Sequence, residues 1–246
     1  MKSTPAKVLF VDIETAPSLG WVWGKWQQDV IDFKTDWYLL SCAWKWAHNR
    51  KVEVVGLPDF PNYKPDSDND RAIVERLWEL LNEADIIVAH NGDGFDLPKI
   101  NTRFISLGLQ PPKPYQTIDT LKIARAKFKF DSNKLDELGR YLKLGRKLPH
   151  TGFHLWRGCM AGDKRAWATM KRYNAKDVAL LEKVYYRMRP WHGTHPSVTA
   201  GEAGCPKCSS SKASKRGFTY TIARRRKQRF QCLSCFGWFL GPAVKV

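Results

Sequence analysis

The feature that most constrains the fold is an apolar run near the N-terminus that ends in two carboxylates. Val8–Val11 predicts a buried strand, and Asp12 and Glu14 follow it with one apolar residue between them. Because side chains alternate across a strand, both acids project from the same face. Two neighbouring carboxylates at the end of a buried strand repel each other and are costly to desolvate, so the fold must supply compensating charge.

Two further blocks of the sequence carry acids in suitable positions. The block from Asn91 to Asp96 follows a short apolar run, and the block from Tyr173 to Asp177 lies in a helical pattern. Tyr173 and Asp177 are four residues apart and therefore share a helix face. If the fold brings the three blocks together, divalent cations are the obvious compensation for the acids, and oxygen ligands suit Mg²⁺ or Mn²⁺. Such a cluster is typical of a two-metal site for phosphoryl transfer.

In their order and secondary structure, the three blocks resemble the motifs of the DEDDy branch of the DnaQ-like 3′–5′ exonucleases. The resemblance covers roughly residues 6–190. It is similar to the exonuclease domains of family B DNA polymerases and to stand-alone relatives encoded by bacteria and phages. It implies an α/β, ribonuclease-H-like fold with a mixed five-stranded sheet flanked by helices. It also implies hydrolysis of phosphodiester bonds of DNA or RNA from the 3′ end.

The resemblance further implies roles for five residues. Asp12 would bridge two Mg²⁺ or Mn²⁺ ions, while Glu14 and Asp177 would complete the site that binds the attacking water. Asp96 would hold the second ion. Tyr173 would orient the water, since a phenol pKa near 10 favours orientation over full general-base action.

The residues alone leave alternatives open. Asp96 could cap the helix that follows it, and Asp93 competes with it as the metal ligand of the second block. Tyr173 could be a packing residue. By the resemblance, Thr15 and Asn91 would contact the terminal nucleotide.

A different motif occupies the C-terminal part. Cys205 and Cys208, and then Cys232 and Cys235, form two C-x2-C pairs separated by 23 residues. This spacing predicts one structural Zn²⁺ in a four-cysteine zinc ribbon, with a β-hairpin between the pairs. We therefore expect a ribonuclease-H-like domain at 1–190, a linker rich in Pro, Gly, Ser and Thr at 191–204, and a zinc ribbon at 205–246.

The ribbon is strongly basic. Residues 201–246 carry 10 Lys and Arg against Glu202 alone, out of a net charge of +17 for the chain. Basic residues interleaved with aromatics predict phosphate contacts and base stacking, although a solvated strand edge is the alternative. The residues expected to bind nucleic acid are Lys212, Lys215, Arg216, Arg224, Arg225, Arg226, Lys227 and Arg229.

The apolar segments add expectations about location and packing. No stretch is long enough to span a membrane and the N-terminus is polar, so we expect a cytoplasmic protein without a signal peptide. Six of the 11 Trp lie between Trp21 and Trp46, and core packing is the preferred interpretation of them. Helices are expected at 71–84, 97–107, 133–144 and 163–188.

The leading hypothesis is thus a metal-dependent 3′–5′ exonuclease whose zinc ribbon binds nucleic acid. DNA is the preferred substrate, although the residues alone do not distinguish it from RNA. The competing hypotheses are a structure-specific endonuclease on the same fold and a binding or recruitment protein. The latter includes a proofreading subunit that associates with a polymerase or other replication or repair proteins.

Overall fold

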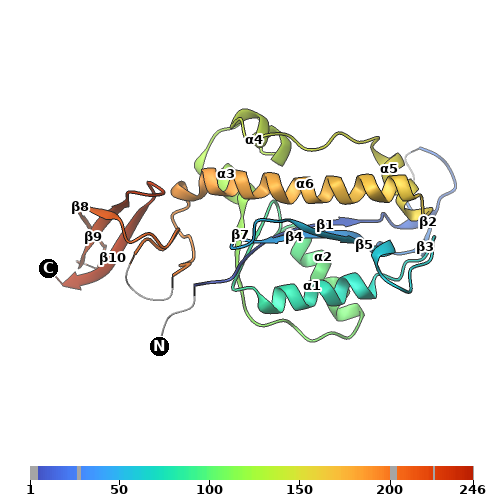
Figure 1. Ribbon diagram of the computed structural model, residues 1–246, viewed down its shortest axis with the longest axis horizontal. Helices are drawn as coiled ribbons and strands as arrows, with labels where there is room; N and C mark the ends of the chain where they lie inside the picture. The colour runs from blue at the N-terminus through green and yellow to red at the C-terminus, as the bar shows by residue number, and fades with distance from the viewer. Residues whose placement is uncertain (1–4, 27–28, 200–203, 224, 246) are drawn as a thin grey trace.

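The computed structural model describes residues 5–26, 29–199, 204–223 and 225–245. A central sheet carries helices on both faces, and a smaller sheet lies beyond the C-terminal end of the long helix α6, which spans Lys164–Met188 (Figure 1). None of the helices in these described ranges has the length and apolar character needed to cross a bilayer.

The central sheet has five strands in the order β5-β4-β1-β6-β7. Strand β1 pairs antiparallel with β4 and parallel with β6, so the sheet is mixed. This confirms the ribonuclease-H-like α/β fold expected from the sequence. The strands are β1 (Val8–Thr15), β4 (Leu39–Trp46), β5 (Glu53–Gly56), β6 (Ile86–Ala89) and β7 (Gln116–Asp119).

Helices cover the two faces of this sheet, and the buried apolar residues form two clusters. On one face lie α1 (Arg71–Glu83) and α2 (Asp96–Ser106). On the other lie α6 and two short helices, α3 (Thr120–Lys127) and α4 (Leu135–Tyr141). The expected helices are therefore present, with ends that differ by a few residues.

The alternation of β1 sets the position of the two N-terminal acids. Leu9, Val11 and Ile13 pack in the cluster with α1 and α2. Val8 and Phe10 pack in the cluster with α6. Because side chains alternate along a strand, Asp12 and Glu14 continue the row that faces α6.

Two strands and one α-helix of the main domain were not expected. They are α5 (Phe153–Met160) and a hairpin of β2 (Leu19–Trp21) and β3 (Asp32–Thr35). The hairpin overturns part of the tryptophan prediction. Trp44 and Trp46 are buried in the core, but Trp21, Trp23 and Trp26 are exposed, with Trp23 at 89%. Within the described residues the hairpin strands pair only with each other, and these three rings remain exposed.

The ribbon is a three-stranded sheet of β8 (Ala213–Tyr220), β9 (Arg225–Cys232) and β10 (Trp238–Lys245) in the order β10-β9-β8. The expected hairpin is thus present, with a third strand after the second cysteine pair. The segment before it packs on the main body. The Ala6 amide donates to the Val198 carbonyl, and the Val198 amide donates to the Pro206 carbonyl at 2.8 Å. The buried Lys207 ammonium donates to the Pro190 carbonyl at 2.7 Å.

Candidate active site

Three carboxylates meet at the end of the central sheet. Asp12 and Glu14 come from β1 and Asp177 from α6, and one oxygen of each lies within 4.8 Å of the others. The two strand acids face α6 because of the alternation of β1. Asp177 is buried on the sheet-facing side of the helix, one turn beyond Tyr173. The structure therefore brings the first and third sequence blocks together.

Asp96 comes from the second block and lies beside this group. It is the first residue of α2, it is almost fully buried, and its Oδ1 accepts a hydrogen bond from the Ile13 amide at 3.2 Å. Its side chain does not cap the helix. The competing Asp93 instead forms a 2.6 Å ion pair with the exposed Lys122. The geometry therefore favours Asp96 over Asp93 as the acid of the site.

Burial disfavours the charged forms of all four acids, and repulsion within the group adds to this at Asp12 and Glu14. Burial, followed by the charges of Asp96, Glu14 and Asp177, raises the pKa of Asp12 well above its usual range. Burial and Asp177 raise the pKa of Glu14 to about 8. Burial raises the pKa of Asp96 to about 7, although the hydrogen bond from the Ile13 amide lowers it. Burial also raises the pKa of Asp177. A group of acids with such values requires positive charge before it can ionise fully.

Lys147 supplies one positive charge and was not singled out in the sequence. Its Nζ lies 2.6 Å from Asp177 Oδ2 and donates to the Tyr173 hydroxyl oxygen at 3.0 Å. Burial is the largest single effect and lowers the pKa of Lys147, but the charge of Asp177 and the contacts with Asp177 and Tyr173 together outweigh it and raise the pKa. Lys147 lies on the loop between α4 and α5, where it is one of many basic residues, so no local pattern distinguishes it.

Asn174 is a second residue that the sequence reasoning missed. Its Nδ2 donates to Asp12 Oδ2 at 2.6 Å and to the Asp12 carbonyl at 3.2 Å. Its Oδ1 accepts a hydrogen bond from the Ser41 hydroxyl at 3.0 Å, and the side chain is fully buried. Asn174 therefore fixes the orientation of the Asp12 carboxylate. Its place three residues before Asp177, next to Tyr173, was the available signal.

The donor set fits hard divalent cations. Both Asp177 oxygens are buried without a hydrogen-bond partner, and the close Lys147 contact is an ion pair without hydrogen-bond geometry. Four acids face a single lysine, which leaves a deficit of positive charge. Carboxylate oxygens are the ligands that Mg²⁺ and Mn²⁺ prefer. Asp12, Glu14 and Asp177 would therefore hold such ions, with Asp96 at the edge of the group.

The Tyr173 hydroxyl points into the same site, while its ring is held by other aromatics. The ring lies edge-on to His150 at 4.8 Å and to Trp156 at 6.2 Å between centroids. Burial and the charge of Asp177 raise the pKa of Tyr173 to about 12. The hydroxyl therefore keeps its proton, so this side chain can orient a water molecule but is a poor base.

Two clefts flank the acids. One of about 480 Å³ is lined by Asp12, Asn91, Arg125, Lys134 and Lys147, among others. The other, of about 360 Å³, is lined by Thr15, Trp37, Phe95 and Lys99, with the Lys99 ammonium 3.7 Å from the Trp37 ring centroid. Thr15 and Asn91 therefore each lie in a cleft next to the acids.

The four ribbon cysteines form a second candidate metal site. One Sγ of each lies within 4.8 Å of the others. The Cys232 sulfur faces the amides of Ser234 and Cys235. Burial raises the pKa of Cys232, but these amides and the sulfurs of Cys208 and Cys235 together outweigh burial and lower the pKa to about 6. Four thiolates fill a tetrahedral zinc sphere and leave no open position, so this group suits a structural Zn²⁺.

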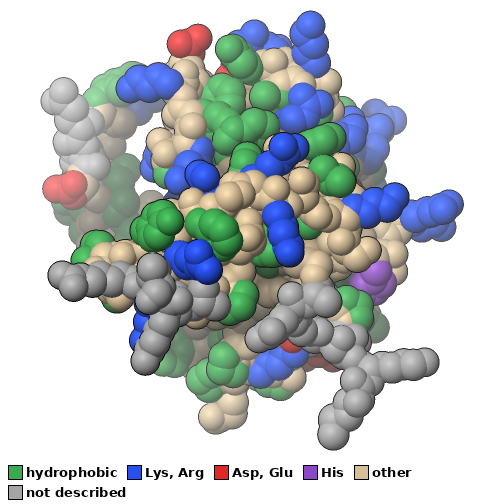
Figure 2. All heavy atoms as spheres, turned by 90° about the vertical axis from the view of Figure 1, so that its left-hand side faces the viewer, with side chains coloured by type: hydrophobic (Ala, Val, Ile, Leu, Met, Phe, Trp, Pro, Cys, Tyr) green, Lys and Arg blue, Asp and Glu red, His purple; other side chains and the backbone are tan. Residues whose placement is uncertain are grey.

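The basic residues of the ribbon are spread over its surface. Figure 2 looks onto this end of the molecule and shows many Lys and Arg side chains and few acidic ones. Arg226 lies over the Phe218 ring at 4.7 Å, and Lys227 is partly buried. Arg224 lies outside the described residues. The other expected contacts are exposed, namely Lys212, Lys215, Arg216, Arg225 and Arg229.

Comparison with known proteins identifies the family. A stretch of 67 residues is 50% identical to the PolC-type DNA polymerase III of Ureaplasma parvum serovar 3, and it covers 27% of this chain and 4% of that protein. The fold is similar to that of the family B DNA polymerase from the archaeon Pyrobaculum calidifontis. That match has a TM-score of 0.54 and 17% identity and covers 76% of this chain and 26% of the polymerase, so it concerns the fold alone.

The chain thus spans only a small part of either polymerase. A family model described as RNase_H superfamily matches residues 32–189, which is more than half of the chain. The matched range includes Asp96, Tyr173 and Asp177, and β1 precedes it. The protein belongs to the RNase H superfamily, and its main domain is nuclease-like.

Proposed function

We propose that the protein is a metal-dependent 3′–5′ exonuclease that hydrolyses phosphodiester bonds of DNA. The observation that carries this proposal is the convergence of Asp12, Glu14 and Asp177 on an RNase H-type sheet, with Asp96 and Tyr173 beside them. The direction of attack follows from the resemblance of these residues to the DEDDy exonucleases. DNA is preferred because both matched polymerases are named as DNA polymerases.

The chain's own residues prepare the site for this chemistry. Two divalent cations, when bound to the four acids, would stabilise the entering and leaving oxygens of an in-line displacement. Asn174 holds Asp12 in one orientation through two hydrogen bonds. Lys147 occupies a lone pair of the Tyr173 oxygen, so the hydroxyl proton remains available for donation. Tyr173 can therefore position a water molecule at the acids without giving up its own proton.

The surroundings support a nucleic-acid substrate. The cleft with Asn91 also contains Arg125, Lys134 and Lys147, which can neutralise phosphates. We propose that Thr15 and Asn91 contact the terminal nucleotide from the two flanking clefts. We further propose that the four-cysteine group holds one Zn²⁺ and that the basic ribbon binds the nucleic acid. A cytoplasmic role beside a polymerase or other replication or repair proteins fits the same hypothesis.

The test is a nuclease assay with the full chain. Single-stranded DNA and RNA, labelled at the 5′ or 3′ end, are incubated with Mg²⁺ or Mn²⁺. A ladder of 5′-labelled products that shorten stepwise supports the proposal. Asp12→Ala should abolish it, whereas Asp93→Ala, which removes an acid outside the cluster, should retain it.

Other outcomes would separate the alternatives. Internal fragments would indicate an endonuclease. Strong salt-sensitive binding without cleavage under any metal condition would indicate a binding or recruitment protein and would refute the enzyme hypothesis.

A further inference from the structure

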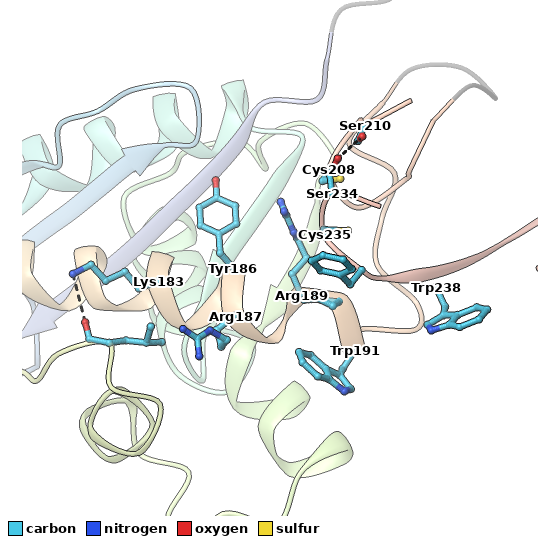
Figure 3. A pocket seen from close by; sticks show the side chains of 13 residues that line it. Lys183, Tyr186, Arg187, Arg189, Trp191, Cys208, Ser210, Ser234, Cys235 and Trp238 are labelled. Carbon is cyan, nitrogen blue, oxygen red and sulfur yellow. Dashed lines mark hydrogen bonds between the residues drawn. The ribbon is translucent and has the colours of Figure 1, made fainter. Parts of the chain in front are cut away.

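A cleft of about 1010 Å³ lies where the end of α6 meets the ribbon, away from the acids (Figure 3). One wall comes from α6 and the turn that follows it, with Lys183, Arg187 and Trp191. The other wall comes from the ribbon, with Phe236 and Trp238. We call it the junction cleft.

The charged side chains that line the junction cleft are positive. Lys183, Arg187 and Arg189 line it, and no acidic residue is found among the described residues of its lining. The Arg189 guanidinium lies over the Tyr186 ring at 4.8 Å, and its Nε is buried without a hydrogen-bond partner. A cleft with three cations and no acid is suited to a polyanion.

Flat aromatic rings are the second component. Trp191 and Trp238 are 54% and 50% exposed, and they lie on opposite walls. The Trp191 ring is held edge-on by Phe128 at 5.6 Å between centroids. Half-exposed indole rings next to cations can stack unpaired bases while the cations bind phosphates. Bases in a duplex are already stacked on each other, so this combination favours a single strand.

The two walls are held in a fixed relation. The Lys207 ammonium of the ribbon donates to the Pro190 carbonyl at the end of α6. The Tyr185 hydroxyl and the His195 ring nitrogen are 2.8 Å apart, which anchors the connecting segment on the same helix. The junction cleft is therefore formed before any ligand binds, which lowers the entropic cost of binding.

The junction cleft and the acids lie along one helix. At 1.5 Å per residue, Lys183 is about 9 Å and Arg187 about 15 Å along α6 from Asp177. Leu144, which lines the cleft, lies three residues before Lys147, which contacts Asp177. A strand whose end lies at the acids can therefore continue towards the junction cleft.

We propose that the junction cleft binds single-stranded nucleic acid, with bases on Trp191 and Trp238 and phosphates on Lys183 and Arg187. The statement that this strand is the substrate rests on the proposed exonuclease function. The binding itself does not. The cleft differs from the β8–β9 hairpin, on which the sequence places the nucleic-acid contacts.

The test measures binding to the full chain carrying Asp12→Ala, so that the strand stays intact. The probe is a fluorescently labelled oligo(dT) of about 20 nucleotides, which is longer than the stretch that one single-strand-binding module usually covers. Fluorescence anisotropy gives Kd for the parent, for Trp191→Ala with Trp238→Ala, and for Tyr220→Ala. Tyr220 is the matched control, because it is a 70% exposed aromatic of the same ribbon outside the cleft lining.

We expect the double tryptophan substitution to weaken binding by about tenfold or more, from the usual contribution of base stacking. Arg187→Gln should reduce the slope of log K against log salt by about one. Zinc content and circular dichroism check that the variants remain folded. The proposal is overturned if the tryptophan variant binds like the parent while Tyr220→Ala weakens binding. It is also overturned if a duplex binds as tightly as the single strand.

The two proposals can fail separately. If the wild-type chain cleaves no strand but the tryptophan variant loses binding, the junction cleft stands and the exonuclease hypothesis fails. If the wild-type chain degrades DNA but the tryptophan variant binds normally, the exonuclease hypothesis stands and this inference fails.

Discussion

Replacing Lys147 with Met tests how the charge of the acid site is balanced. The Asp177 side chain is 1% exposed and the Lys147 side chain 31%, with 2.6 Å between Nζ and Oδ2. Removal of one partner from a buried ion pair costs about 3–5 kcal/mol, because the other charge is left without compensation. We expect the lower end, about 3 kcal/mol at pH 8, because Asp177 can take up a proton and water reaches Lys147.

The raised pKa of Asp177 also predicts how the cost of Lys147→Met changes with pH and with Mg²⁺. A carboxyl whose pKa is raised in the folded state destabilises the fold increasingly as the pH rises above its unfolded value. The cost of Lys147→Met should therefore be larger at pH 8 than at pH 5. Saturating Mg²⁺ replaces the lost positive charge beside Asp177, so the cost should then fall to about 1 kcal/mol or less.

The assay is urea unfolding of the zinc-loaded protein, followed by tryptophan fluorescence with and without Mg²⁺. Lys122→Met is the matched control, because the Lys122–Asp93 pair has the same 2.6 Å separation but an exposed lysine. Its transition should be close to that of the parent, as expected for a surface pair. An equal cost of Lys147→Met with and without Mg²⁺ would refute the idea that cations and Lys147 compensate the same carboxylate.

Three further predictions concern the pH dependence that Glu14 causes, the role of Tyr173 and the metal site of the ribbon. The pKa of Glu14 is raised to about 8, so the stability of the protein without divalent cations should fall as the pH rises from about 4.5 to 8. Over the same range the affinity for Mg²⁺, measured by calorimetry, should rise. An affinity that does not change with pH would contradict this. Tyr173→Phe should unfold within about 1.5 kcal/mol of the parent but hydrolyse DNA about 10²-fold more slowly; unchanged turnover would make Tyr173 a packing residue. Cys232→Ser should lose the single equivalent of zinc and allow trypsin to cleave the ribbon first; full zinc content would contradict the four-cysteine site.

Much of the fold could be predicted because its signals are local. The apolar run of β1 and its two acids determine one strand, one face and half of the acid cluster. The helical spacing of Tyr173 and Asp177 places them on one face of α6, and the cysteine spacing predicts the ribbon. Each of these patterns is contained in a short segment, so no tertiary information is needed to recognise it.

The residues that were missed depend on contacts between distant segments. Lys147 lies on a loop 30 residues before Asp177, and only the fold shows which of the many basic side chains enters the site. Trp23 and Trp44 belong to the same tryptophan-rich stretch of the sequence. Trp23 lies exposed in the β2–β3 hairpin, whereas Trp44 is buried in the central sheet. Burial of a tryptophan depends on what packs against it, which hydrophobic composition does not specify.

The packed segment between α6 and the ribbon has a thermodynamic consequence. Val198 forms hydrogen bonds with both Ala6 and Pro206, and Lys207 forms one with Pro190. Hydrogen bonds therefore join the segment around Cys205 and Cys208 to the main domain and the end of α6. If the four cysteines hold Zn²⁺ as proposed, its binding orders this segment as well as the ribbon. Loss of the metal would loosen the helix end, and a chelator would lower the stability of the main domain although it acts at a distant site.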